Sequence, residues 1–254
     1  MQAARGQLEV LRKREPIDEV IAADDTPAEL TARLQLIEQA RQFSIDELGL
    51  PDNGSYRSFA DLERDYALWN VVAAPELSLD PKQWCYPIVG CVSYRGYFSE
   101  SKARRLGENL GAEGYDVLVG GVAAYSTLGR FDDPILNTMM HWDDVDLVAV
   151  MFHELAHQVL YIKDDSGFNE SFATAVEEFG IERWLLDRGA AAEIDAYHAR
   201  RDLQRELMQL VAAARDDLDV IFAAARPAEE MRRQKQQRLE QLSANALEAY
   251  ARAE

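Results

Sequence analysis

Two histidines stand four residues apart in the run His153-Glu154-Leu155-Ala156-His157. In a helix, side chains at positions i and i+4 lie one above the other, so both imidazoles point the same way with Glu154 beside them. This is the HExxH spacing of zinc peptidases, in which the histidines bind the metal and the glutamate acts as general base. The motif predicts that His153 and His157 are metal ligands and that Glu154 is catalytic.

A catalytic zinc takes three protein ligands and keeps a fourth position open. Residues 158–163 contain no histidine, so the third ligand must come from elsewhere. We expect it to be Glu170, because Glu170 lies in a second helical pattern that a short turn could fold back against the first. Asp164 and Asp165 are nearer in sequence and stay as alternatives.

Glu177 lies two turns beyond Glu170 on the same helical face. We expect this carboxylate to hold one of the histidine rings in orientation, as residues around metal ligands often do. Apolar residues surround the motif, which predicts a buried helix in which unpaired polar side chains would be costly. The alternative is a buried His-Glu-His group that is satisfied without metal.

Two kinds of element must position these residues: helices, and a small group of strands before the motif. Strands are expected over 66–74, within 84–98 and over 115–128, where aromatic and β-branched residues gather. Because a peptide substrate can pair with an exposed strand, residues 122–128 are our candidate for a substrate-binding edge; a core strand is the alternative. Asp143 or Asp144 is placed to cap the motif helix.

The remaining chain has mainly helical patterns. We expect a helix over 3–23 broken at Pro16, a helix opened by a capping box at Thr26 and ended near Gly49, and a short helix from Ser58. Further helices are expected over 100–112, 167–188, 190–225 and 228–253. The predicted fold is α+β and predominantly helical, with a small antiparallel sheet packed beside a zinc-binding helix pair. It forms one domain, 1–254, made of N-terminal helices (1–65), a sheet and HExxH core (66–190) and long C-terminal helices (191–254).

The composition limits the partners. There are 27 Lys and Arg residues against 45 Asp and Glu residues, a net charge of −18, which disfavours nucleic acid and anionic lipid. The longest stretch without charge, Val117 to Gly129, is too short to cross a bilayer. Cys85 and Cys91 are six residues apart; the spacing fits either a short disulfide loop or two thiols.

Several segments together resemble a bacterial family usually described as predicted aminopeptidases, HExxH zinc metallopeptidases of the gluzincin kind. They are Gly6-Gln7-Leu8, LPDNGSYRSFADL at 50–62, WCYPIVGCVSYRGYF at 84–98, AYSTLGRFDDPILNT at 124–138, HELAHQ at 153–158 and FNESFATAVEEFG at 168–180. The resemblance implies zinc (Zn2+) on His153, His157 and Glu170, with Glu154 catalytic.

Members of that family usually carry an export or lipoprotein signal ahead of the Gly6 region and continue further at the other end. The resemblance therefore implies a location in the bacterial cell envelope or periplasm, with the cytoplasm as the alternative, and it favours a Cys85–Cys91 disulfide. The oligomeric state does not follow from the sequence.

The leading functional hypothesis is hydrolysis of peptide or protein substrates by zinc-dependent catalysis, with aminopeptidase action ahead of endopeptidase action. The mechanism needs a hydrogen-bond donor for the oxyanion, and the candidates are Tyr94, Tyr125, His141 and His198. An aminopeptidase also needs a carboxylate for the substrate's α-ammonium group, for which Asp132, Asp133, Glu177 and Glu178 are candidates. The alternative is a helical cell-envelope binding protein with a structural or vestigial zinc site.

Overall fold

The structure is a computed structural model that describes residues 2–86, 90–127, 129 and 131–253. The chain divides into two compact units, Met1–Leu68 with Gly121–Ala191 (the first unit) and Trp69–Gly120 with Ala192–Glu254 (the second unit). Helices hold 59% of the residues and strands 14%, which confirms a predominantly helical α+β fold. The prediction of one domain stays a prediction.

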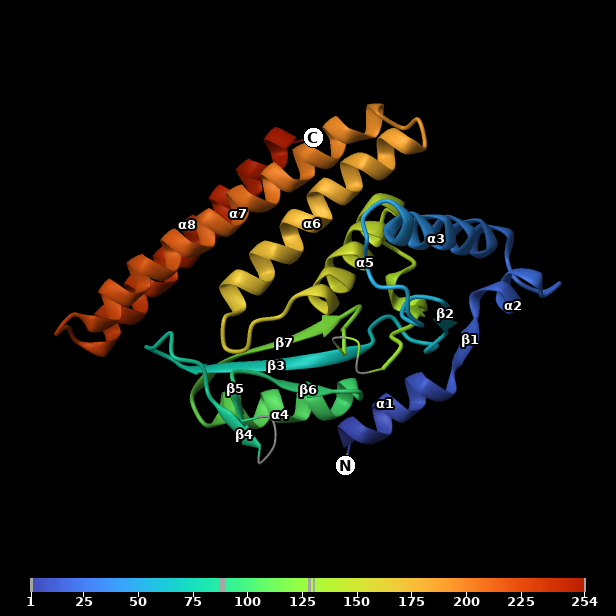
Figure 1. Cartoon of the computed structure of the whole chain (residues 1–254). Helices are drawn as coiled ribbons and strands as arrows, with labels where there is room; N and C mark the ends of the chain where they lie inside the picture. The colour runs from blue at the N-terminus through green and yellow to red at the C-terminus, as the bar shows by residue number, and fades with distance from the viewer. Residues whose placement is uncertain (1, 87–89, 128, 130, 254) are drawn as a thin grey trace. The chain divides into compact units, whose positions relative to one another are not determined.

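The first unit contains a three-stranded sheet and most of the shorter helices (Figure 1). Its elements are α1 (Gln2–Arg12), β1 (Arg14–Pro16), α2 (Ile17–Ala22), α3 (Ala28–Asp46), β2 (Ser58–Ala60), β8 (Ile135–Leu136), a 3-10 helix (Asn137–Met139), α5 (Asp144–Val159) and α6 (Ser166–Asp187). In the sheet, β2 pairs antiparallel with β1 and parallel with β8, so that Phe59 lies opposite Ile135.

Helices α3, α5 and α6 pack together and form the core of the first unit (Figure 1). Phe152 is fully buried on α5, and its ring stacks on that of Phe43 with centroids 6.4 Å apart. A Cβ at Gly180 would lie 2.8 Å from Leu48 and 2.9 Å from Phe152. The absence of a side chain at Gly180 therefore lets α6 approach α5 closely enough to share a site with it.

The second unit combines two small sheets with the longest helices. Its elements are β3 (Leu68–Pro75), β4 (Trp84–Tyr86), β5 (Gly90–Val92), β6 (Arg95–Tyr97), α4 (Glu100–Ala112), β7 (Tyr115–Val122), α7 (Ala192–Ala223) and α8 (Ala228–Ala253). Helix α4 packs on the β6-β3-β7 sheet, where Trp69, Val71 and Leu110 belong to one buried cluster. A Cys85–Cys91 disulfide joins β4 to β5.

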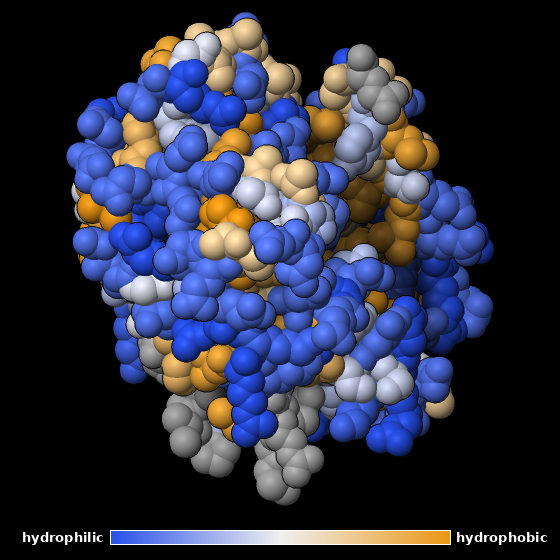
Figure 2. Space-filling view, turned by 90° about the vertical axis from the view of Figure 1, so that its right-hand side faces the viewer, coloured by the Kyte–Doolittle hydropathy of each residue, from blue (hydrophilic) through white to orange (hydrophobic). Residues whose placement is uncertain are grey.

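Helices α7 and α8 pair along their length (Figure 1). Arg232 on α8 donates two hydrogen bonds, of 2.8 and 2.9 Å, to the carboxylate of Glu76 just after β3. No helix within the described residues is long and apolar enough to cross a membrane. The face of the molecule drawn in Figure 2 is covered mainly by hydrophilic side chains, with hydrophobic ones scattered among them, as the acidic composition leads one to expect.

Three local predictions were wrong. Residues 58–60 form β2 and not a helix. They pair with β1 and β8, which lie far away in the sequence, so local sequence patterns do not show this pairing. The hydroxyl of Thr26 donates to the carbonyl of Val20 (2.6 Å) and does not cap α3, whose N-cap is Pro27. The strand expected over 115–128 ends at Val122, so the described residues after it, 123–127 of the candidate substrate edge, are not a strand.

Side chains replace the missing strand partner after Val122. The Thr138 hydroxyl donates to the carbonyl of Ala123 (2.5 Å), and the Asp133 carboxylate accepts the backbone N–H of Thr127 (2.7 Å). These bonds satisfy backbone groups that a ladder would otherwise use. Residue 128 lies outside the described residues.

Candidate metal centre

Helix α5 carries the two histidines of the HExxH motif on one face. Its buried side consists of Leu147, Val148, Met151 and Leu155, which fixes the rotation of the helix. The rings of His153 and His157 are 4.8 Å apart between centroids and nearly perpendicular, at 83°. The i, i+4 spacing therefore brings the imidazoles together, as the sequence predicts.

Helix α6 brings the carboxylate of Glu170 to the same place. Oε2 of Glu170 lies 3.3 Å from Nε2 of His153, and Oε1 lies 3.5 Å from Nε2 of His157. Among the residues that the structure describes, these three form the one group of at least three His, Cys, Asp or Glu side chains whose atoms converge closely enough to hold a metal ion, with ligand atoms within 4.8 Å of one another. Glu170 therefore lies beside the two histidines, and its role as third metal ligand stays a prediction.

The donor set fits a catalytic zinc. Ligands bound 2.0–2.1 Å from a tetrahedral ion lie about 3.3 Å from one another, close to the two separations above. Nδ1 of His157 is buried without a hydrogen-bond partner in the described chain, so no bond holds that ring in another orientation. No fourth side chain of the described part joins this group of three.

The turn between α5 and α6 is held by Asn169, which sequence reasoning missed. This buried side chain accepts the backbone N–H of Ile162 (2.7 Å) and donates to the carbonyl of the same residue (2.8 Å). Asp165, an alternative ligand in the sequence analysis, instead caps α6 by accepting the N–H of Phe168 (3.0 Å). The only sequence signal for these hydrogen bonds was that a polar residue, Asn169, directly precedes Glu170.

Glu177 orients His153, as predicted. Its Oε2 lies 3.0 Å from Nδ1 of the ring, and the Glu177 side chain is 9% exposed. Burial lowers the pKa of His153, but the hydrogen bond to Glu177 and the negative charges of Glu177, Glu154 and Glu170 outweigh it, so the pKa lies above its ordinary value. Engaging Nδ1 in this way leaves Nε2 directed to Glu170.

Glu154 lies beside the histidines in a separate polar cluster. Burial raises the pKa of its carboxyl, and a hydrogen bond from the Ser126 hydroxyl and the nearby His153 and His157 oppose that rise. The same hydroxyl lies 3.4 Å from Oδ2 of the buried Asp133. Sequence reasoning did not single out Ser126, because only the tertiary fold brings it to α5.

Tyr56 completes this cluster. Its hydroxyl is bonded to Ser126, and burial, followed by the charges of Glu154 and Asp133, raises its pKa well above the usual value. Tyr56 also has a φ of 62°, a left-handed conformation that costs a non-glycine residue about 1 kcal/mol or more. The loop around it must therefore be held firmly, and its N–H donates to the carbonyl of Asp133 (2.7 Å).

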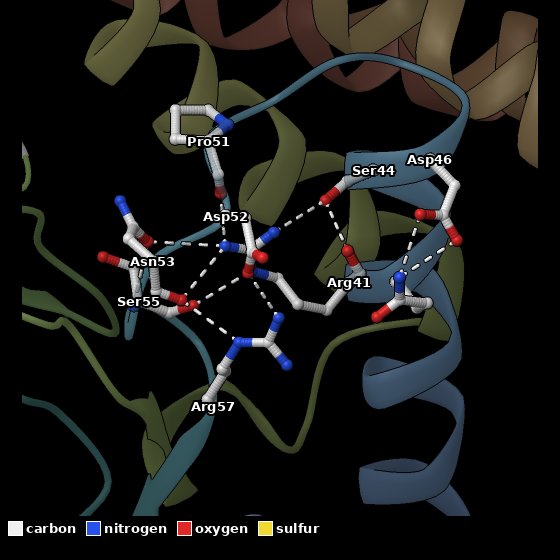
Figure 3. A network of polar contacts seen from close by, with 9 residues as sticks. Arg41, Ser44, Asp46, Pro51, Asp52, Asn53, Ser55 and Arg57 are labelled. Carbon is white, nitrogen blue, oxygen red and sulfur yellow. Dashed lines mark hydrogen bonds and ion pairs between the residues drawn. The ribbon is translucent and has the colours of Figure 1, made fainter.

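Arg41 on α3 holds that loop from inside (Figure 3). Its buried guanidinium donates to the carbonyls of Ser55 (3.0 Å) and Pro51 (2.5 Å) and to the Ser44 hydroxyl (3.1 Å). Burial, then the charge of Arg57, lowers its pKa. The loop in turn holds the residue after His157, because Asn53 donates to Gln158 (2.7 Å) and Gln158 donates to Ser55 (3.3 Å).

The remaining predicted residues have other roles or positions. The Tyr125 hydroxyl donates to Gln7 (2.8 Å), and His141 lines a pocket of about 480 Å³ with Arg64 and Tyr66. Asp133 is 3% exposed and accepts hydrogen bonds from Thr127, so it cannot hold an α-ammonium group. Tyr94 and His198 belong to the second unit.

Comparison with protein families identifies the family of this chain. A family model described as "Putative aminopeptidase" matches residues 1–253, so the chain belongs to that family. A search of curated proteins found no match, and neither did a search of solved structures. The family description supports a peptidase-like function.

Proposed function

We propose that the protein is a zinc-dependent metallopeptidase and that it acts as an aminopeptidase. The observation that carries the proposal is the convergence of His153 Nε2, His157 Nε2 and the Glu170 carboxylate, with Glu154 beside them. The family description supports the aminopeptidase assignment. A peptide is the matching substrate class, because HExxH sites hydrolyse peptide bonds.

The three ligands would hold the zinc, which when bound supplies Lewis acidity toward water and the scissile carbonyl. Glu154 takes a proton from the attacking water as the new C–O bond forms. The C–N bond then breaks, and Glu154 returns the proton to the leaving amine. Burial raises the pKa of Glu154, which suits a group that must both accept and release a proton near neutral pH.

The first experiment measures metal content and peptide hydrolysis together. The purified protein should hold near-stoichiometric zinc, and His153→Ala and Glu170→Ala should each lose it. Glu154→Gln should keep the zinc and lose turnover. Zinc retained by Glu170→Ala would move the third ligand elsewhere, and turnover by Glu154→Gln would remove Glu154 from the mechanism.

The position of cleavage needs its own test. One peptide is offered with a free amino terminus and with an acetylated one. An aminopeptidase requires the free α-ammonium group and leaves the acetylated peptide intact. Equal cleavage of both would identify an endopeptidase on the same centre.

The location in the cell envelope is also a proposal. The disulfide between Cys85 and Cys91 supports it, because disulfides persist mainly in oxidising compartments. Fractionation of cells expressing the full natural gene, followed by thiol labelling, would test it. Protein in the cytoplasm with both cysteines labelled would contradict it.

A further inference from the structure

The chain leaves the metal-binding face of α5 through a short segment, Leu160–Ile162, that is neither helix nor strand. Leu160 has extended backbone angles, φ −145° and ψ 123°. Its residues are apolar and exposed: Leu160 by 39%, Tyr161 by 52% and Ile162 by 42%. The Tyr161 ring lies 6.3 Å from that of His157 between centroids, at 71°. This segment therefore borders the metal centre directly.

Asn169 holds one side of the segment and leaves the other side free. Both backbone groups of Ile162 are bonded to the Asn169 side chain. In an extended chain, successive residues direct their N–H and C=O groups to opposite sides. By this alternation we infer that the N–H and C=O of Tyr161 are directed away from Asn169, and no backbone–backbone hydrogen bond among the described residues involves either group. A short, unpaired backbone edge results.

We propose that Leu160–Ile162 is a substrate-binding edge, which pairs through Tyr161 with the backbone of an extended peptide. The inference rests on the proposed peptidase function and adds the substrate class to it. Such pairing is the β-strand addition by which many proteins bind unstructured peptides. The Glu170 side chain, 65% exposed, leaves the metal centre open to solvent for a peptide in this position.

The same segment also predicts which substrate side chain is preferred next to the scissile bond. The half-exposed ring of Tyr161 beside His157 offers an apolar surface that a large apolar or aromatic side chain would cover. The nearby carboxylates of Glu154, Glu170 and Glu177 repel an acidic side chain. The substrates are therefore extended peptides with a large apolar residue beside the cleaved bond.

The test measures binding to zinc-loaded Glu154→Gln protein, with three fluorescent peptides that differ only in a Phe, Ala or Asp beside the scissile bond. The Phe peptide should bind about tenfold or more tighter than the other two. Adding Tyr161→Ala should abolish that preference, while Tyr161→Phe should keep it. Leu186→Ala is the matched control and should keep the preference, because Leu186 is a similarly exposed apolar side chain near the far end of α6.

The backbone contact is tested on the peptide, so that the protein is unchanged. N-methylation of one amide at a time, at the residues flanking the scissile bond, removes one N–H donor and should weaken binding at the position that pairs with Tyr161. Equal binding of all three peptides, an unchanged preference in Tyr161→Ala, or no weakening by any N-methyl group would overturn the proposed edge.

Hydrolysis by the unaltered zinc-loaded protein separates the two proposals. Cleavage that does not depend on Tyr161 would support the peptidase function and contradict the proposed substrate-binding edge. Tyr161-dependent binding without cleavage of any peptide would support the substrate-binding edge and contradict the peptidase function. No binding of any peptide would overturn the edge.

Discussion

Nδ1 of His153 lies 3.0 Å from Oε2 of Glu177, while Nε2 of the same ring lies 3.3 Å from Oε2 of Glu170. The Glu177 carboxylate thus orients the imidazole ring, and the Glu170 carboxylate lies next to its other nitrogen. Both come from α6, seven residues apart and on the same face of the helix. The pairing of α5 with α6 therefore positions Glu170 and Glu177 on His153 together.

Replacing Glu177 should weaken metal binding without unfolding the protein. In Glu177→Ala, Nδ1 of His153 loses its partner and the ring is free to turn, so we expect zinc affinity to fall about 10- to 100-fold. Competition with a chromophoric chelator measures this. Glu178→Gln is the matched control, since its side chain projects about 100° around the helix from Glu177. Equal affinity in both variants would deny Glu177 this role.

Ser126 should matter for turnover and not for metal. Its hydroxyl bonds to Glu154 and lies near Asp133, so Ser126→Ala leaves the base less firmly placed. We expect kcat to fall about tenfold, less than the 10²- to 10⁴-fold typical for removing a general base, with zinc content unchanged. Ser171→Ala is the control, because the Ser171 hydroxyl donates to the carbonyl of Gly167 within α6 (2.7 Å). A kcat unchanged in Ser126→Ala would contradict the role.

The convergence of His153, His157 and Glu170 could be predicted from the sequence because their arrangement is local to two helices. The spacing of His153 and His157 determines how their rings meet, and the turn length brings Glu170 back. The extents of α4, α6, α7 and α8 could be predicted in the same way, from the helical spacing of apolar residues and from the proline and glycine residues near the helix ends. Gly189, with a φ of 72°, ends α6 as expected.

The support around the base could not be predicted, because it depends on contacts between distant segments. Arg41 sits in a helical pattern where an arginine is ordinarily solvated, yet it is 1% exposed and bonded to a loop more than nine residues away. Ser126 was assigned to a strand, whereas hydrogen bonds from Thr127 and Thr138 hold that stretch as a loop. Local periodicity contains no information on such side chain–backbone contacts.

Arg41 should contribute strongly to stability. Arg41→Ala would leave the carbonyls of Pro51 and Ser55 buried without a donor, so we expect the free energy of unfolding to fall by about 3 kcal/mol or more. Urea unfolding measures this, provided that the slope of the unfolding free energy against urea concentration is the same in both proteins. Arg57→Ala is the control: its ion pair with Asp52 is exposed and should be worth about 1 kcal/mol or less. A similar loss in both variants would show that the network in Figure 3 does not depend on Arg41.

Tyr125 should make the protein sensitive to alkali. Burial, then the charge of Asp133, raises the pKa of Tyr125 to about 12 from an ordinary value of 10.0. Because the folded state favours the neutral phenol, this contribution is complete below pH 10 and is lost as the pH rises through 12. Two pKa units correspond to about 2.7 kcal/mol, and partial exposure of the ring reduces this to about 1–2 kcal/mol.

Tyr125→Phe tests this by removing the titrating group. The variant loses the hydrogen bond to Gln7 and should be less stable by about 1 kcal/mol at pH 8. Above pH 10 the unfolding free energy of the unaltered protein should fall more steeply than that of the variant, so that the two curves converge. Tyr250→Phe, at an exposed tyrosine on α8, should retain the full pH dependence. Parallel curves for Tyr125→Phe and the unaltered protein would mean that another group causes the alkaline loss.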